Sequence, residues 1–424
     1  MVRYNQQQLP VRTPVTALPA DFRRIRWAAG VSSLGDGFTF VALPLLATTV
    51  SDQPWAAAGT VVAAYVAGLC VTLPSGVLAD RTAPRALMVR GDLSRTVVLA
   101  VLAVLVASGR AGLPVVCVAA FMVACVVPSF ASASRALVPR IVGSADLSRA
   151  NAQLEVAETI GATILGPALS GFAFVLYSWA PFVFDAATYL VSAVVLVGLR
   201  SSAARSAPDP SGHRPGVRET MTAGIRALFG DPFLRALMLM MTVLAFGQSG
   251  TLALIVPYAR VELGLGPVGL GWLLASAGAG GVAGGWAASR ADRLGPGASM
   301  LGAAVSAAAG YGILGFFPSI PGAVAAQSLE VFAVVLGLTV IHSAYQRRVP
   351  QGLVGRVSAA VRLVALASSV VGGTVAAVCA AVGPVTGFMR GACVALAVLV
   401  VLMGSRLCRL GPVVTAGDPA LVPA

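Results

Sequence analysis

The chain has 424 residues, of which 57% are hydrophobic and only 11% are charged, and its formal net charge is +13. Soluble domains carry roughly 25% charged residues, so this composition excludes an ordinary soluble protein and requires most of the chain to face lipid or other apolar helices. All 29 basic residues are arginine. A chain without lysine has neither a P-loop lysine for ATP nor a lysine Schiff base.

Residues 1–26 are polar and basic, and we expect them to form a short cytoplasmic tail. A cleaved signal peptide does not fit, because the first apolar run is long and leads directly into a second. Apolar segments near the ~20 residues that a membrane span needs then follow one another. They lie near 27–50, 55–78, 87–107, 113–133, 152–176, 182–199, 234–258, 267–288, 298–317, 321–343, 358–381 and 386–406. We therefore predict an all-α membrane protein with twelve transmembrane helices.

Arginines recur in every second gap between these segments. They are Arg23, Arg24 and Arg26; Arg81 and Arg85; Arg135, Arg140 and Arg149; several from Arg200 to Arg226; Arg290 and Arg293; Arg347, Arg348 and Arg356; and Arg406 and Arg409. This alternation is typical of cytoplasmic loops and argues against a nucleic-acid binder, whose basic residues gather on one face or tail. It predicts a multi-pass protein with both termini cytoplasmic. Exclusive use of arginine with abundant alanine, glycine and valine indicates a GC-rich bacterial genome, and hence the bacterial plasma membrane.

The two halves of the chain repeat each other at an offset of about 211 residues. Ala79–Arg81 returns as Ala291–Arg293, and Pro139 returns as Pro350. We therefore predict two tandem, pseudo-symmetric six-helix bundles, with a binding site between them near mid-membrane. The predicted parts are the tail 1–26, the N-terminal bundle 27–199, a cytoplasmic linker 200–233, the C-terminal bundle 234–407 and a cytoplasmic tail 408–424. Val217–Leu228 is expected to lie as an amphipathic helix on the membrane surface.

Two motifs in the first half resemble those of a known family. The first, between segments two and three, contains Gly76, Asp80, Arg81 and Arg85. The second, in segment five, contains Glu158, Gly161, Gly166, Pro167 and Gly171. The first looks like the loop signature of the major facilitator superfamily, and the second resembles its antiporter motif. The resemblance implies the major facilitator fold and a secondary transporter without cofactors, which is not an enzyme.

Two further stretches narrow the resemblance. Arg135 to Asn151, and Val349 to Val357, look like the drug/proton antiporter branch that contains macrolide-efflux proteins and the enterobactin exporter. The sequence departs from many drug antiporters in segment four, which runs from Val115 to Phe130 without a charge. A proton relay through an arginine at that position is therefore not carried over.

The loop signature implies a latch, and the antiporter motif implies a kinked helix. In the family, the loop holds one bundle against the start of segment eleven, which here pairs Asp80 with residues near 356–358 while Arg81 and Arg85 hold the loop. An ordinary interfacial loop is the alternative. The Gly-Pro pair bends segment five and its glycines admit a close neighbour. This arrangement seals the outward leak path and favours exchange, unless the glycines serve tight packing alone.

Acids within the spans are the candidate proton carriers. A carboxylate at the centre of a spanning helix costs roughly 2.5–3.5 kcal/mol on insertion scales. Asp36 and Glu330 are central in segments one and ten, Gln327 shares the face of Glu330, and Glu158 is shallower. The alternatives are a structural hydrogen bond for Asp36, and a buried protonated acid or an interhelix pair for Glu330.

Other polar residues are assigned simpler roles. Glu155 is expected to pair with Arg149 or Arg135. Arg95 and Arg362 are available to pair with the intramembrane acids. Asp185 and Arg390 lie nearer the outer surface and are interpreted as structural. The six cysteines show no CxxC spacing and the two histidines lie far apart, so no metal site is predicted. The glycine-rich run 276–285 lies in an apolar segment, which favours helix packing over a phosphate-binding loop.

We predict a monomeric secondary active exporter, driven by proton antiport, for a hydrophobic or amphipathic small molecule. The expected cavity is mainly apolar, with Phe40 and Phe246 among its walls. The first alternative is an exporter of an endogenous polar metabolite such as a siderophore, which requires cations in the cavity. The second is a non-transporting membrane sensor.

Overall fold

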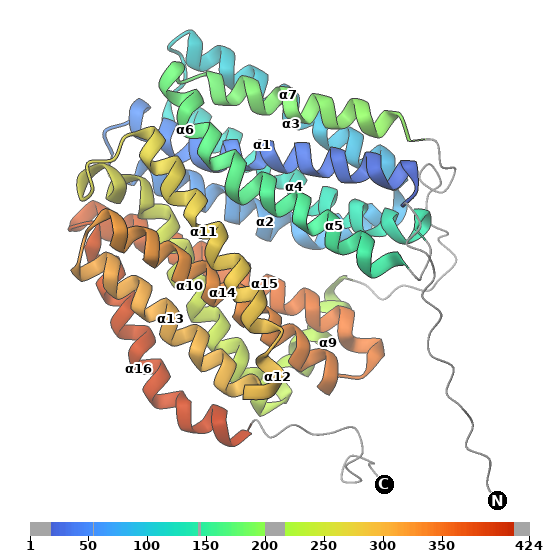
Figure 1. Ribbon diagram of the computed structural model, residues 1–424, viewed down its shortest axis with the longest axis vertical. Coiled ribbons are helices and arrows are strands. Elements are labelled where there is room, and N and C mark those ends of the chain that lie inside the picture. Colours follow the sequence, from blue (N-terminus) through green and yellow to red (C-terminus); the bar gives the residue numbers. More distant parts are fainter. Residues whose placement is uncertain (1–17, 54, 143–145, 200–216, 411–424) are drawn as a thin grey trace, which may run out of the picture.

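The computed structural model describes residues 18–53, 55–142, 146–199 and 217–410. All regular structure in these residues is helical, and it includes twelve helical segments of 18 residues or more. In chain order these are α1 (Ala20–Val50), α2 (Ala56–Arg81), α3 (Pro84–Ala107), α4 (Leu113–Ile141), the continuous α5 (Leu147–Thr159), η2 (Ile160–Leu165) and α6 (Gly166–Leu176), α7 (Ala180–Val197), α10 (Pro232–Val261), α11 (Pro267–Ala288), α13 (Pro296–Phe316), α14 (Ile320–Arg348), α15 (Gln351–Val382) and α16 (Thr386–Leu410). The predicted all-α fold is confirmed (Figure 1).

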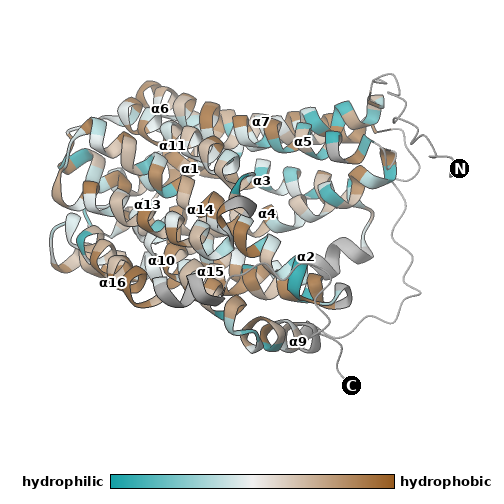
Figure 2. Cartoon of the chain, turned by 60° about the horizontal axis from the view of Figure 1, so that its bottom comes forward, coloured by the Kyte–Doolittle hydropathy of each residue, from teal (hydrophilic) through white to brown (hydrophobic). Residues whose placement is uncertain are grey.

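Ten helices of the described residues are long and apolar enough to cross a membrane. The two other long helices are α2, whose apolar part is Ala56–Thr72, and α3, which carries charges at Arg85, Arg90, Asp92 and Arg95. Figure 2 shows hydrophobic residues along most of the helices, with hydrophilic ones gathered at the ends of α5 and α7. These ends, which we call the inner ends, lie on the side where α1 begins. Arg24 and Arg85 donate to carbonyls at the end of α7, and Arg26 donates to Gln153 of α5 on the same side.

The two halves repeat one packing scheme. In the first half, α2 packs on α4, α3 on α7, and α1 on the α5–η2–α6 segment. In the second half, α11 packs on α14, α13 on α16, and α10 on α15. Each pair in one half is the sequence counterpart of a pair in the other, which confirms the duplication. Between the halves, α2 contacts α15 and α6 contacts α11.

Segment five bends through an unexpected element. The sequence predicts a kink at Pro167, but the helix changes before it, through the six-residue π-helix η2 at Ile160–Leu165. The proline then directly follows the π-helix, inside the continuous segment, where it cannot donate a helical hydrogen bond. A π-turn widens the helix and is frequent at functional sites.

The short helix α9 (Val217–Gly230) covers the predicted amphipathic stretch and packs along α15. A Cβ built on Gly224 would lie 2.7 Å from the Arg356 carbonyl carbon, so the two helices touch backbone to backbone. The short α12 (Ala291–Leu294) joins α11 to α13. The glycine-rich run 276–285 is helical within α11, and a Cβ on its Gly284 would lie 2.8 Å from the Phe332 carbonyl oxygen of α14, which confirms the packing interpretation.

Candidate functional site

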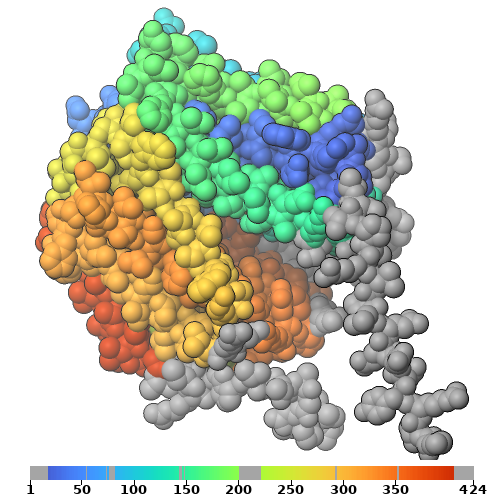
Figure 3. All heavy atoms as spheres, viewed as in Figure 1, coloured from blue at the N-terminus to red at the C-terminus, as the bar shows by residue number. Residues whose placement is uncertain are grey.

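Two cavities meet between the halves. The first, of about 920 Å³, lies between the middle parts of segment five, α11 and α14 and reaches Asp36. The second, of about 390 Å³, lies among α1, α2, α4 and α15. Both are lined by Asp36, Phe40 and Leu252. Volumes of roughly 300–1,000 Å³ are typical of small-molecule sites, and Figure 3 shows a hollow between α5 and the C-terminal helices.

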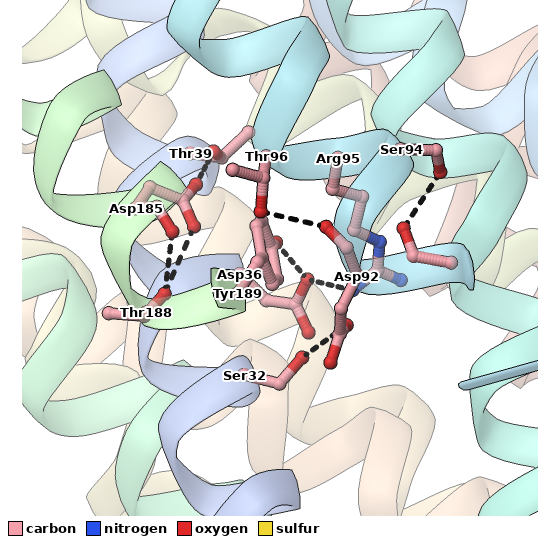
Figure 4. Close-up of polar contacts among 11 residues, drawn as sticks. Ser32, Asp36, Thr39, Asp92, Ser94, Arg95, Thr96, Asp185, Thr188 and Tyr189 are labelled. Carbon is pink, nitrogen blue, oxygen red and sulfur yellow. Dashed lines mark hydrogen bonds and ion pairs between the residues drawn. The ribbon is translucent and has the colours of Figure 1, made fainter. Parts of the chain in front are cut away.

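Asp36 connects these cavities to a buried polar cluster. It comes from α1, its side chain is 32% exposed, and its Oδ1 lies 3.4 Å from Arg95 Nη1 on α3. The same oxygen accepts a hydrogen bond of 2.7 Å from the Tyr189 hydroxyl on α7. One side of the carboxylate therefore faces the cavity while the other is bound to the interior of the N-terminal half (Figure 4).

Arg95 is the cation at the centre of this cluster. Its side chain is 1% exposed, and its guanidinium carbon lies 4.9 Å from the centre of the Tyr189 ring and 5.7 Å from that of Phe130. Its Nε has no hydrogen-bond partner among the described residues. A buried cation held by one carboxylate and two aromatic faces depends strongly on that carboxylate.

Two further acids complete the cluster. Asp92 is buried one turn before Arg95 and accepts a hydrogen bond of 3.4 Å from Ser32 on α1. Asp185, on α7, is buried and accepts hydrogen bonds from Thr39 and Thr188. Asp185 lies in the second turn of α7, near its outer end, and its hydrogen bonds agree with the predicted structural role, while it also interacts electrostatically with Asp36 and Arg95. Asp36, Asp92 and Asp185 thus all interact electrostatically with the single guanidinium of Arg95.

Of the predicted cavity residues, Phe40, Gln327 and Glu330 line the first cavity together with Asp36. Glu330 is only 3% exposed, and its Oε1 has no hydrogen-bond partner among the described residues. Phe246 departs from the expectation: its ring packs 5.7 Å from Phe388, and it is absent from the lining of both cavities. Its position on α10 faces α15 rather than the opening, because a Cβ on Gly372 of α15 would nearly touch the Phe246 carbonyl.

The acids of segment five are arranged differently from the expectation. Glu155 is exposed and lines the first cavity, whereas Arg149 lies 4.0 Å from Asp146. Glu158 is partly buried beside it and interacts electrostatically with Glu155, with Arg135 of α4 and with Asp36. Glu158 thus stands at the inner approach to the cluster, and its neighbour Thr159 lines the cavity in its place.

The glycines of the antiporter motif join segment five to two neighbours. A Cβ on Gly161 would lie 2.8 Å from the Gly30 carbonyl oxygen, and one on Gly166 would lie 2.6 Å from Gly37 Cα, so this face packs directly on α1. Gly171 touches the backbone at Pro267, the first residue of α11. The two halves are therefore closed against each other at the outer ends of α6 and α11, while their inner ends border the first cavity.

The predicted loop signature is mostly helical. Gly76, Asp80 and Arg81 belong to the last turns of α2, and only two residues separate α2 from α3. The side chains of these three residues lie outside the described part of the structure, so the Asp80 latch stays a prediction. Arg85 is placed: its guanidinium donates to the carbonyls of Leu196 (3.0 Å) and Val197 at the end of α7. A cation at a helix C-terminus stabilises that end.

Sequence reasoning missed Asp92 and Tyr189. Asp92 precedes Arg95 by three residues in an apolar segment, a spacing that puts both on one helix face. Tyr189 follows Asp185 by four residues on α7 in the same way. The available signal was therefore the spacing of polar groups within two apolar segments, Asp92 with Arg95 and Asp185 with Tyr189. Ionisable residues inside a membrane span are functional candidates by default.

A twelve-helix carrier with a central cavity is the class that this architecture defines. A model of the Major Facilitator Superfamily matches residues 27–373. The chain belongs to the Major Facilitator Superfamily. A search of curated protein sequences finds no match.

Solved transporter structures share this fold. A bacterial homolog of the human lysosomal transporter Spinster, inward-facing and unoccupied, has a TM-score of 0.69 at 14% identity, covering 93% of this chain and 98% of that one. A bacterial homologue of the iron transporter ferroportin, inward-facing, has a TM-score of 0.70 at 15% identity, covering 93% and 99%. The nucleoside transporter NupG has a TM-score of 0.70 at 10% identity, covering 92% and 99%.

Proposed function

We propose that this protein exports a hydrophobic or amphipathic small molecule in exchange for protons, with Asp36 as the proton carrier. The observation that carries the proposal is the position of Asp36. It lines both cavities, and it is also bonded to a fully buried arginine. A group in this position can exchange a proton with the cavity and transmit the change of charge to the helix bundle.

The substrate is proposed to occupy the joined cavities. Their walls are mainly apolar, with Phe40 and Leu252 at the junction and Gln248 and Gln327 among the polar groups of the first cavity. A few polar groups on an apolar wall select orientation while burial supplies affinity. Spinster and ferroportin homologues that share the fold are described in inward-facing states, and the first cavity here extends to Glu155 and Gly285, toward the inner ends, which supports an inward-facing state.

The exchange cycle follows from the Asp36–Arg95 bond. When Asp36 is ionised, its bond to Arg95 holds α1 against α3, and the cavity wall formed by α1 is fixed in place. Protonation of Asp36 removes the charge, and the desolvated Arg95 must find another acid, of which Asp92 is three residues away. A ligand or proton shifts a two-state carrier only by its different affinity for the two states. Because Arg95 is paired with Asp36 in one state and with Asp92 in the other, the two states differ in their affinity for a proton on Asp36.

Uptake into inverted membrane vesicles tests the function. Energised vesicles from cells that express the protein are offered N-phenyl-1-naphthylamine, 8-anilino-1-naphthalenesulfonate and ethidium, which are neutral, anionic and cationic amphipathic dyes. We expect uptake of at least one dye that stops when nigericin collapses the pH gradient and that is lost in Asp36→Asn. Gradient-independent uptake would contradict antiport, and dye binding without any uptake would favour the sensor.

The direction of export depends on the proposed topology, which labelling can check. Single cysteines are placed at Gln53, next to the outer end of α1, and at Gly212, on a background without the six native cysteines. We expect an impermeant maleimide added to intact cells to label the cysteine at position 53 and to spare the one at position 212. The opposite pattern would reverse the orientation of the cavity and exclude export by this scheme.

A further inference from the structure

Arg362 is a cation without a counter-charge at the cavity wall. It lies on α15 inside the apolar span Leu353–Val382, lines the second cavity and is exposed there. Among the described residues no side chain forms an ion pair or hydrogen bond with it. Leaving a charge unpaired inside a membrane span costs several kcal/mol unless water or a ligand solvates it, so the position favours an anionic guest.

The surroundings of Arg362 increase its positive potential. Arg135 of α4 acts electrostatically on Arg362 and also on His342 of α14. Arg135 and Arg362, one from each half, thus place two guanidinium groups within electrostatic range of each other. Arg135 has an acidic neighbour in Glu158, whereas no acid within the described residues acts comparably on Arg362. Arg362, unlike Arg135, therefore has a charge that remains available to bind an anionic ligand.

The remaining wall of the second cavity suits the body of an amphipathic molecule. Leu366 stands one turn beyond Arg362 on the same helix, and Phe40 and Leu252 lie at the junction with the first cavity. Tyr65 and Thr72 of α2 add hydroxyl groups to the same wall. A guanidinium at one end of an apolar pocket with a few hydroxyls binds a planar oxyanion through charge-assisted hydrogen bonds.

We propose that Arg362 forms an anion subsite, so that the transported molecule is an amphipathic acid with a carboxylate, sulfonate or phosphate group. This inference rests on the proposed function only in placing the substrate in the joined cavities. Asp36 shares the cavity with this subsite, but its charge is neutralised by Arg95 while their bond is closed. The conformer described here can therefore accept an anion without strong repulsion from Asp36.

Two dyes with the same aromatic body and different charge test the subsite. N-phenyl-1-naphthylamine is neutral, and 8-anilino-1-naphthalenesulfonate carries one sulfonate on the same skeleton. Binding is measured by fluorescence to the full-length protein in lipid nanodiscs, with empty nanodiscs subtracted. We expect the wild-type protein to bind the sulfonate more tightly than the neutral dye, and we expect Arg362→Gln to weaken sulfonate binding about tenfold, or about 1.4 kcal/mol. Neutral-dye binding should change less than twofold.

Control variants separate charge from packing. Arg362→Lys should retain part of the preference, because it keeps the charge but loses the planar fork. Arg235→Gln, at an exposed arginine on α10 outside both cavities, should bind both dyes like wild type. Equal binding of the two dyes by wild type would overturn the proposal without any variant, as would equal losses for both dyes in Arg362→Gln. Because dye binding in nanodiscs needs no proton gradient, a negative binding result does not contradict proton-driven uptake into vesicles. A negative uptake result likewise does not contradict the anion subsite.

Discussion

The two halves of the molecule pack in the same way but place different chemistry at mid-membrane. The N-terminal half holds two buried acids, a buried arginine and the cavity-facing Asp36, joined by bonds among α1, α3 and α7. The C-terminal half offers Glu330 on α14 and Arg362 on α15, neither of which forms an ion pair with another described residue. Asp36 has Gln248 as its repeat counterpart, and both line the first cavity. The two copies thus share a scaffold, but only the N-terminal half joins its intramembrane acids to a buried arginine among the described residues.

The strongest test of this difference compares the two arginines. Arg95→Met leaves buried carboxylates without their cation, and breaking a buried pair in this way costs about 3–5 kcal/mol. Arg362→Met removes a side chain that faces the cavity and should cost little. Thermal unfolding in detergent should therefore show a large loss for Arg95→Met and a near-wild-type transition for Arg362→Met. The double variant Asp36→Asn/Arg95→Met should recover part of the loss. Two variants of equal stability would remove the basis for treating the halves differently.

A transport comparison between the acids of the two halves sharpens the assignment of the proton. Asp36→Asn should lower gradient-driven uptake into inverted vesicles by at least about tenfold, which corresponds to about 1.4 kcal/mol in a rate barrier. Glu330→Gln should retain most of the uptake, because Glu330 is buried without a cationic partner and its amide can occupy the same space. Glu158→Gln should fall between them. If Glu330→Gln alone abolished uptake, the proton would be carried in the C-terminal half.

Glycine contacts permit a third comparison, between segment five and α15. A Cβ on Gly166 would clash with the backbone of α1, and one on Gly372 would lie 2.5 Å from Ser249 Oγ of α10. Overpacking of this kind costs typically 1–3 kcal/mol, so both alanine variants should unfold earlier and transport more slowly. Gly355→Ala, where a Cβ meets nothing within 4 Å, is the matched control. If Gly166→Ala destabilises the protein and Gly372→Ala does not, the expectation for α15 is wrong, and segment five is packed more closely against its neighbour than α15 is.

The fold could be predicted from the sequence because each of its determinants is local or periodic. Apolar segments of membrane length, arginines in alternate gaps and the offset of about 211 residues were enough for twelve helices in two bundles. The shape of segment five was not predictable in detail. A proline forbids a hydrogen bond only at its own position, whereas the π-helix at Ile160–Leu165 depends on how segment five packs against α1 and α11.

The candidate site was predictable only in part, for a similar reason. Depth along a helix identified Asp36 and Glu330 as intramembrane acids, and the cavity contacts both. Partners depend on helix rotation, which a single sequence specifies poorly. The electrostatic link of Asp185 to Asp36 and Arg95 was therefore not foreseen, and Phe246 was assigned to a wall that it does not line. Arg362 was predicted to be available for pairing with the intramembrane acids, but no described acid pairs with it, which its sequence position alone could not reveal.

The smallest expected effect concerns the outer contact between the halves. Arg260 on α10 donates a hydrogen bond of 2.7 Å to Thr48 Oγ1 on α1, and this bond joins the halves on the side where the cavity is closed. A typical hydrogen bond contributes about 0.5–1.5 kcal/mol net, and both groups are solvent-accessible, so Arg260→Gln should shift the balance toward the outward-open state only about two- to tenfold. Spin labels at Asp52 and Pro384, near the outer ends of the two halves, should report a larger population of long distances. Arg110→Gln, an exposed outer arginine that joins no helices across the halves, is the control.

Thr48→Ala should produce the same shift as Arg260→Gln, and the double variant should add little, because both changes remove one bond. An unchanged distance distribution in Arg260→Gln would assign the closed outer side to the backbone contact of Gly171 with Pro267 alone.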